Sequence, residues 1–222
     1  MQTAFESNEA CTARRGVRDP VSGYSHLAGC ALACIGAAAL LARAASLDAR
    51  VTGVVYGACL VALYAASSAY HLAPSGEVLR RRLRSLDHAA IFLLIAGTCT
   101  PVFWRAFDGV ARVAMLAGVW VVGALGIAFR LAWPKAPRWL YTAMYVAMGW
   151  MFVIQGPRGF HALPAVAMGL VLAGGVTYTA GAVVYALKRP DPFPRVFGFH
   201  EIWHLFVLAG SALHYAAVAA IV

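Results

Sequence analysis

Charged side chains are scarce in this chain: 12% of its 222 residues are Asp, Glu, Lys or Arg, whereas 62% are hydrophobic. A soluble domain carries about 25% charged and about 45–50% apolar residues. The mean hydropathy of the chain is +0.72. The composition excludes an ordinary soluble domain and predicts a polytopic membrane protein.

Lysine is nearly absent, because 16 of the 18 basic residues are arginine. The formal net charge is +9, and most of the cations lie in short segments between apolar runs. The charge therefore indicates membrane topology and anionic headgroups, and no nucleic-acid partner is expected. Neither Lys135 nor Lys188 lies in the last apolar run, which excludes a retinal Schiff base there.

The five cysteines form no CxxC motif, and four of them lie inside or beside apolar runs. They are interpreted as small packing residues, so no disulfide framework is expected. The N-terminal segment also lacks the basic, apolar and small-residue order of a signal peptide. Residues 1–23 are therefore predicted to be a cytoplasmic tail, mobile over residues 1–17, and the first apolar run to be a retained helix.

Long apolar runs are what the chain does contain. A helix needs about 20 apolar residues to span a bilayer, and seven runs come near that length. They cover residues 24–45, 51–72, 86–107, 110–133, 138–155, 162–187 and 199–222. Because the connecting segments are short, residues 24–222 are predicted to form one all-α domain, a seven-transmembrane helix bundle.

Basic residues predict the orientation of this bundle. The tail and the even-numbered loops, with their flanks, hold 13 Lys and Arg residues, and the opposite side holds 5. Cytoplasmic segments carry the excess of positive charge. The N-terminus is therefore predicted to be cytoplasmic and the C-terminus outside, the reverse of rhodopsin-type receptors.

The last run opens with the string HEIWH, from His200 to His204. Histidines at i and i+4 share one helix face, and both can reach one zinc ion at about 2.0–2.1 Å. The alternative is a histidine pair at headgroup level. The string also fits the H-E-x-x-H pattern, in which Glu201 would be a general base; Glu201 is equally interpreted as an interfacial residue facing the basic loops.

The predicted topology brings further polar residues to the same end of the bundle. The second run ends at His71, and the third begins beside Asp87. At about 1.5 Å rise per residue, these residues, Ser67, His200 and His204 are expected within roughly 10 Å of the cytoplasmic boundary. Hydropathy alone does not require these five residues to lie at the same end of the bundle. Their common position therefore favours one shared site.

We predict that His71, His200 and His204 bind a metal, with zinc as the cofactor. Three imidazoles leave a fourth position open, which is typical of a catalytic zinc. Asp87 and Ser67 are the predicted catalytic residues, as a proton acceptor and a hydrogen-bond partner. Each has an alternative interpretation: Asp87 as a first-turn acid favoured by the helix dipole, with Ser85 as the cap, and Ser67 as a hydroxyl bonded to its own helix.

Four segments of the chain carry a family resemblance: DPVSGYSHLAG (19–29), SSAYHL (67–72), LDHAAIFLLIAGTCTP (86–101) and HEIWHLFVLAGSALHY (200–215). They resemble the motifs of the hemolysin III family, the bacterial branch of the progestin and adiponectin receptor (PAQR) superfamily. The resemblance covers almost the whole chain and implies a multi-pass protein of the bacterial inner (plasma) membrane. It implies a zinc held by His71, His200 and His204 with Ser67 and Asp87 beside it, and it argues against the HExxH glutamate as general base.

The opening motif departs from the family pattern, because Asp19 stands where Glu is usual and Ser22 where Asn is usual, whereas His26 agrees. The superfamily includes alkaline ceramidases, so the resemblance implies hydrolysis of a lipid amide, with a membrane lipid as partner. Two alternatives stay open: a non-catalytic membrane sensor or homeostasis protein with a structural zinc, and a hemolysin-like pore-forming cytolysin. An intramembrane peptidase would rest on H-E-x-x-H alone.

Besides His26 of the opening motif, three histidines lie outside the predicted site. His88 is expected to be interfacial, because it points roughly 100° away from Asp87 around its helix. His161 is expected to be solvated in an outer loop. His214 lies about 15 Å beyond His204 along the helix, too far to bind the same metal.

Overall fold

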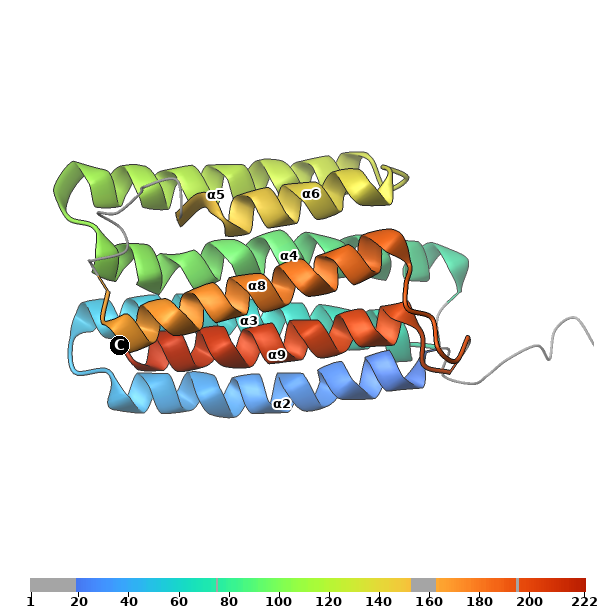
Figure 1. The fold of residues 1–222 in the computed structure, drawn as a ribbon, viewed down its shortest axis with the longest axis horizontal. Helices are drawn as coiled ribbons and strands as arrows, with labels where there is room; N and C mark the ends of the chain where they lie inside the picture. Colours follow the sequence, from blue (N-terminus) through green and yellow to red (C-terminus); the bar gives the residue numbers. More distant parts are fainter. Residues whose placement is uncertain (1–18, 75, 153–162, 195) are drawn as a thin grey trace, which may run out of the picture.

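The computed structural model describes residues 19–74, 76–152, 163–194 and 196–222. Within these residues the chain forms seven α-helices and no β-sheet (Figure 1). They are α2 (Pro20–Arg43), α3 (Leu47–Leu72), α4 (Glu77–Ala106), α5 (Gly109–Ala132), α6 (Arg138–Gly149), α8 (Ala165–Leu187) and α9 (Phe199–Ala219). All of them except α6 are long and apolar enough to cross a membrane. The chain is therefore the predicted all-helical, multi-pass membrane protein.

Several expectations fall outside the described residues. They are the mobility of residues 1–17, the end of the predicted fifth span at 153–155, and the exposure of His161. The described part of that fifth span is α6, which has 12 residues.

Three helices begin four or more residues earlier than hydropathy predicted, among them α3, which begins at Leu47 and not at residue 51. α4 begins at Glu77, nine residues before the predicted start, so the four arginines at 80–82 and 84 lie on its first turns and not in a loop. α2 begins at Pro20, inside the predicted tail, with proline in the first turn. Proline suits this position because its missing N–H would have no helical partner there. Hydropathy missed these starts because each of the first turns contains polar or charged residues.

Consecutive helices pack side by side, and α9 returns to contact α2 and α4 (Figure 1). α4 is the most enclosed helix, since it contacts α3, α5, α6 and α9. Of its most apolar 18-residue window, 72% is buried, against 17% for α5. Side chains in this apolar part of α4 therefore face protein over most of the helix circumference.

Glycines allow close approach where helices cross, as is common in membrane bundles. One such contact joins α5 to α4, where a Cβ atom at Gly126 would overlap the ring of Phe92. Phe92 is 1% exposed and packs against Tyr145 with ring centroids 4.6 Å apart. This contact fixes the depth at which α5 sits against the central helix.

Four helix termini meet at one end of the bundle. The start of α2, the end of α3, and the starts of α4 and α9 lie together, at the right of Figure 1. α9 ends at the opposite end, where the C-terminus is marked. The arginines on the first turns of α4 lie at the shared end, so the positive-inside rule predicts that this end is cytoplasmic.

Candidate metal centre

Three histidines converge at the shared end of the bundle. His200 and His204 lie one turn apart on α9, and His71 lies in the last turn of α3. One ring atom from each lies within 4.8 Å of the others. Their ring centroids are 4.7 to 5.1 Å apart. The three residues that the spacing predicted as ligands therefore form a cluster that could hold a metal ion.

The donor atoms of this cluster fit a metal. His71 and His204 are buried, and Nε2 of His71 and Nδ1 of His204 have no hydrogen-bond partner among the described residues. Buried polar atoms are rarely left without a partner, so each calls for one. Around a tetrahedral zinc at about 2.0–2.1 Å, donor nitrogens lie roughly 3.4 Å apart. The three ring atoms lie within 4.8 Å of one another, so they would reach that spacing by approaching by up to roughly 1.4 Å.

Ser67 and Asp87 lie beside the histidines. Both line a small cavity of about 30 Å³, together with His26, His200 and His204. The structure therefore brings all five predicted site residues to one place, four of them around this cavity and His71 next to it.

The structure contradicts the alternative interpretations of Ser67 and Asp87 as residues with local helix roles. Ser67 Oγ lies 2.8 Å from Nδ1 of His26, whereas the neighbouring Ser68 donates to the carbonyl of Tyr64. Asp87 follows the start of α4 at Glu77 by ten residues, so it is not in the first turn. Neither residue serves the local helix role proposed as its alternative.

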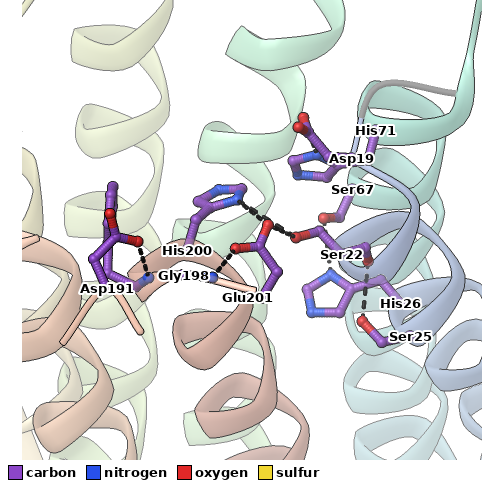
Figure 2. A network of polar contacts seen from close by, with 11 residues as sticks. Asp19, Ser22, Ser25, His26, Ser67, His71, Asp191, Gly198, His200 and Glu201 are labelled. Atoms are coloured by element: carbon purple, nitrogen blue, oxygen red, sulfur yellow. Dashed lines mark hydrogen bonds and ion pairs between the residues drawn. The ribbon is translucent and has the colours of Figure 1, made fainter. Parts of the chain in front are cut away.

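Sequence reasoning left the role of the opening motif undecided, and the structure places it in the site (Figure 2). Oδ2 of Asp19 lies 3.2 Å from Nδ1 of His71. Ser22 is fully buried and donates to Glu201 Oε1 at 3.1 Å. The spacing of these polar residues ahead of the first apolar run was the available signal, but no rule on spacing predicts contacts with the ends of other helices.

Both carboxylate oxygens of Glu201 accept hydrogen bonds. Its Oε2 accepts from the backbone N–H of Gly198 at 2.8 Å, and its Oε1 accepts from Ser22 (Figure 2). A carboxylate at this position satisfies a free N–H at the helix start and is favoured by the helix dipole. This geometry supports neither a general base nor a residue facing the basic loops.

The prediction for His88 is wrong. His88 is buried, not interfacial, and it lines the small cavity. Its ring meets the edge of Tyr141 at a centroid distance of 5.2 Å. The prediction failed because α4 has protein on several sides, so turning away from Asp87 does not lead to the surface.

His214 lies deeper in the bundle. Its Nδ1 donates to the carbonyl of Gly210 at 2.9 Å, and its ring stacks on Tyr178. It is not among the clustered metal-ligand candidates, as its distance along α9 predicted. It lines a second, larger cavity.

This larger cavity has a volume of about 110 Å³ and lies among α3, α4, α6, α8 and α9. Its walls are mostly aliphatic and aromatic side chains. The two cavities share five wall residues: Leu63, Ile91, Tyr145, Trp203 and Val207. An apolar space in the bundle therefore adjoins the polar cavity at the histidines.

Comparison with known proteins agrees with the motifs and the fold. The model of a family described as "Haemolysin-III related" matches residues 15–215. "Hemolysin-3" of Bacillus cereus is 34% identical over 77% of this chain and 75% of that protein. "Hemolysin-3 homolog" of Bacillus subtilis is 32% identical over 76% of each. "Heptahelical transmembrane protein ADIPOR2" of rice is 34% identical over 60% of this chain and 65% of that protein.

The match to the family extends from before α2 into α9 and so includes every residue of the histidine cluster. Two bacterial relatives exceed 30% identity over about three quarters of the chain. The chain belongs to the hemolysin III family.

Proposed function

We propose that this protein is a zinc-dependent hydrolase of a lipid amide, with the metal held by His71, His200 and His204. The observation that carries the proposal is the contact between the two cavities. The apolar cavity and the polar cavity share a wall that includes Leu63 and Trp203. An amphiphile can therefore place a hydrocarbon segment in one and a polar group in the other.

The cavity walls favour a membrane lipid over a water-soluble substrate. The larger cavity presents mainly apolar side chains, which match a hydrocarbon chain that enters from the bilayer. The groups at its polar end are imidazoles, a carboxylate and a hydroxyl. The alkaline ceramidases that belong to the wider superfamily make an amide bond the first choice for the reacting group.

The residues of the site divide the chemistry between them. Zinc, when bound, would supply a Lewis acid for the carbonyl group. In this proposal Asp87 accepts a proton from the attacking water as the oxygen of that water bonds to the carbonyl carbon. Delivery of that proton to the nitrogen lets the C–N bond break, so the products are a fatty acid and an amine. Ser67 and Asp87 line the same cavity. The hydrogen bond between Ser67 and His26 holds the Ser67 hydroxyl in position.

The first experiment is the metal content of the purified, full-length protein. We expect one zinc per chain in the wild type and its loss in His204→Ala. His214→Gln is the matched control, because His214 lies on the same helix and outside the cluster. A folded wild-type protein that binds no metal would contradict the proposal at its base.

The second experiment separates catalysis from a structural metal. Asp87→Asn should keep the zinc and lose turnover of a long-chain lipid amide by about 10²-fold or more. Turnover that survives in Asp87→Asn would count against the hydrolase. Bound zinc with no turnover in the wild type would instead favour the non-catalytic sensor.

A further inference from the structure

The first turns of α2 present Asp19, Ser22 and His26 at spacings of three and four residues, so all three share one face. That face lies against the histidine cluster (Figure 2). We infer that Asp19 and Ser22 position the metal ligands, by holding the ring proton of His71 and of His200 on Nδ1 and so presenting Nε2 to the metal. The inference rests on the metal binding proposed above.

The contact of Asp19 with His71 fixes the state of that ring. A carboxylate only accepts hydrogen bonds, so Nδ1 of His71, 3.2 Å from Oδ2 of Asp19, is the donor. A neutral ring with its proton on Nδ1 has its lone pair on Nε2. Nε2 of His71 is buried and has no hydrogen-bond partner among the described residues. Carboxylate, histidine and metal in this order recur in metal sites, where the carboxylate orients the ring.

Asp19 contacts His71 in place of the local hydrogen bond that an N-cap residue usually makes. It is the N-cap residue of α2, and an aspartate there normally accepts a hydrogen bond from the backbone two or three residues on. Its side chain makes no such capping bond. The carboxylate turns to His71 on another helix. This orientation is expected of a residue that acts on the site.

Ser22 fixes the second ring by a similar argument. Its single hydroxyl proton goes to the Glu201 carboxylate at 3.1 Å, because the carboxylate cannot donate. The Ser22 oxygen is then an acceptor for Nδ1 of His200, which lies 3.5 Å away. His200 therefore donates to Ser22, and Ser22 donates to Glu201. Nε2 of His200 is left with its lone pair.

Close packing holds this face of α2 in place. Gly23 follows Ser22, and a Cβ atom there would overlap the side chain of Leu72 and lie 3.2 Å from Cβ of His71. The absence of a side chain at position 23 allows α2 to approach the end of α3. Asp19 and Ser22 precede Gly23 on α2, so this close approach brings them near the rings of His71 and His200.

The test measures zinc affinity of the purified full-length protein by competition with a chromophoric chelator. Loss of a side chain that hydrogen-bonds to a metal ligand typically reduces metal affinity by 10- to 100-fold, and we expect a loss of that size in Asp19→Ala. Asp19→Glu should restore most of it, because the carboxylate is retained. Ser22→Ala should also weaken binding, whereas Ser25→Ala should not, because the Ser25 hydroxyl bonds to the backbone carbonyl of Ser22.

A second readout separates positioning from stability. The visible spectrum of the Co²⁺-loaded protein reports coordination geometry, and it should change in Asp19→Ala but not in Ser25→Ala. The melting temperature of the metal-free protein should be nearly the same for wild type and Asp19→Ala. An equal loss of stability with and without metal, at unchanged affinity, would overturn the inference.

The outcomes distinguish this inference from the proposed function. If wild type and Asp19→Ala bind zinc equally well and His204→Ala does not, the metal site stands and the positioning role is wrong. If the wild type binds no zinc, both are wrong. A weakened Asp19→Ala that Asp19→Glu rescues supports both.

Discussion

The imidazole rings of His26 and His204 lie 3.9 Å apart between centroids and are tilted by 40°. His204 belongs to the histidine cluster, whereas His26 does not. Nδ1 of His26 is instead 2.8 Å from Ser67 Oγ. His26 therefore packs against a candidate ligand and hydrogen-bonds to a candidate catalytic residue. It links the two parts of the site from outside the histidine cluster.

Substitution of His26 should affect turnover more than metal content. An asparagine amide reaches the position of Nδ1, whereas a glutamine amide reaches that of Nε2. His26→Asn can therefore keep the hydrogen bond to Ser67, and His26→Gln cannot. We expect both variants to hold one zinc, with lipid-amide turnover reduced about tenfold or more in His26→Gln and less in His26→Asn. Loss of zinc in both variants would show instead that His26 is needed for metal binding.

Filling the apolar cavity should block the substrate and spare the metal. Gly175 on α8 lines the larger cavity, and the nearest atom to a Cβ there is 3.5 Å away, on Trp150. Gly175→Leu should raise KM for a long-chain lipid amide about tenfold, the loss expected when roughly 1.4 kcal/mol of binding is removed. Zinc content should stay at one per chain.

The control for this variant lies on the same helix. Gly169 faces open space and does not line the cavity. Gly169→Leu adds the same side chain to α8 and should leave KM unchanged. Equal KM values in the two leucine variants would mean that the cavity is not the lipid site.

Much of the fold and the centre of the site were predictable because they rest on local patterns. Apolar runs of about 20 residues fix the spans, and the i,i+4 spacing of His200 and His204 fixes their common face. Because successive helices cross the membrane in opposite directions, His71 at the end of the second span is expected at the same end of the bundle as His200 and His204. These steps need only the length of each helix and its direction, both of which hydropathy supplies.

The contacts of the opening motif could not be predicted in this way. The Asp19–His71 pair is separated by 52 residues and the Ser22–Glu201 pair by 179. Each contact depends on how α2 is rotated about its axis, and a uniformly apolar helix gives little information on rotation. The error for His88 has the same origin, since its burial depends on the neighbours of α4 and not on its own sequence.

The packing of α5 against α4 provides a test of stability. A methyl group at Gly126 would overlap the buried ring of Phe92. Overpacking of this kind costs about 1–3 kcal/mol, so Gly126→Ala should lower the melting temperature of the detergent-solubilised protein. Gly118 lies on the same helix with open space around it. Gly118→Ala should leave the melting temperature unchanged or raise it, because alanine favours helix. Equal melting temperatures in the two variants would contradict this packing.

The orientation of the bundle can be tested by cysteine labelling in intact cells. Lys135 follows α5 at the end that holds the histidine cluster, and Asp108 precedes α5 at the other end; both are exposed. With the five native cysteines replaced, a membrane-impermeant maleimide should label Asp108→Cys and leave Lys135→Cys unlabelled until the cells are broken. The reason is the excess of basic residues at the end where Lys135 lies. The opposite labelling pattern would place the histidine cluster outside, where a lipid substrate would have to come from the outer leaflet.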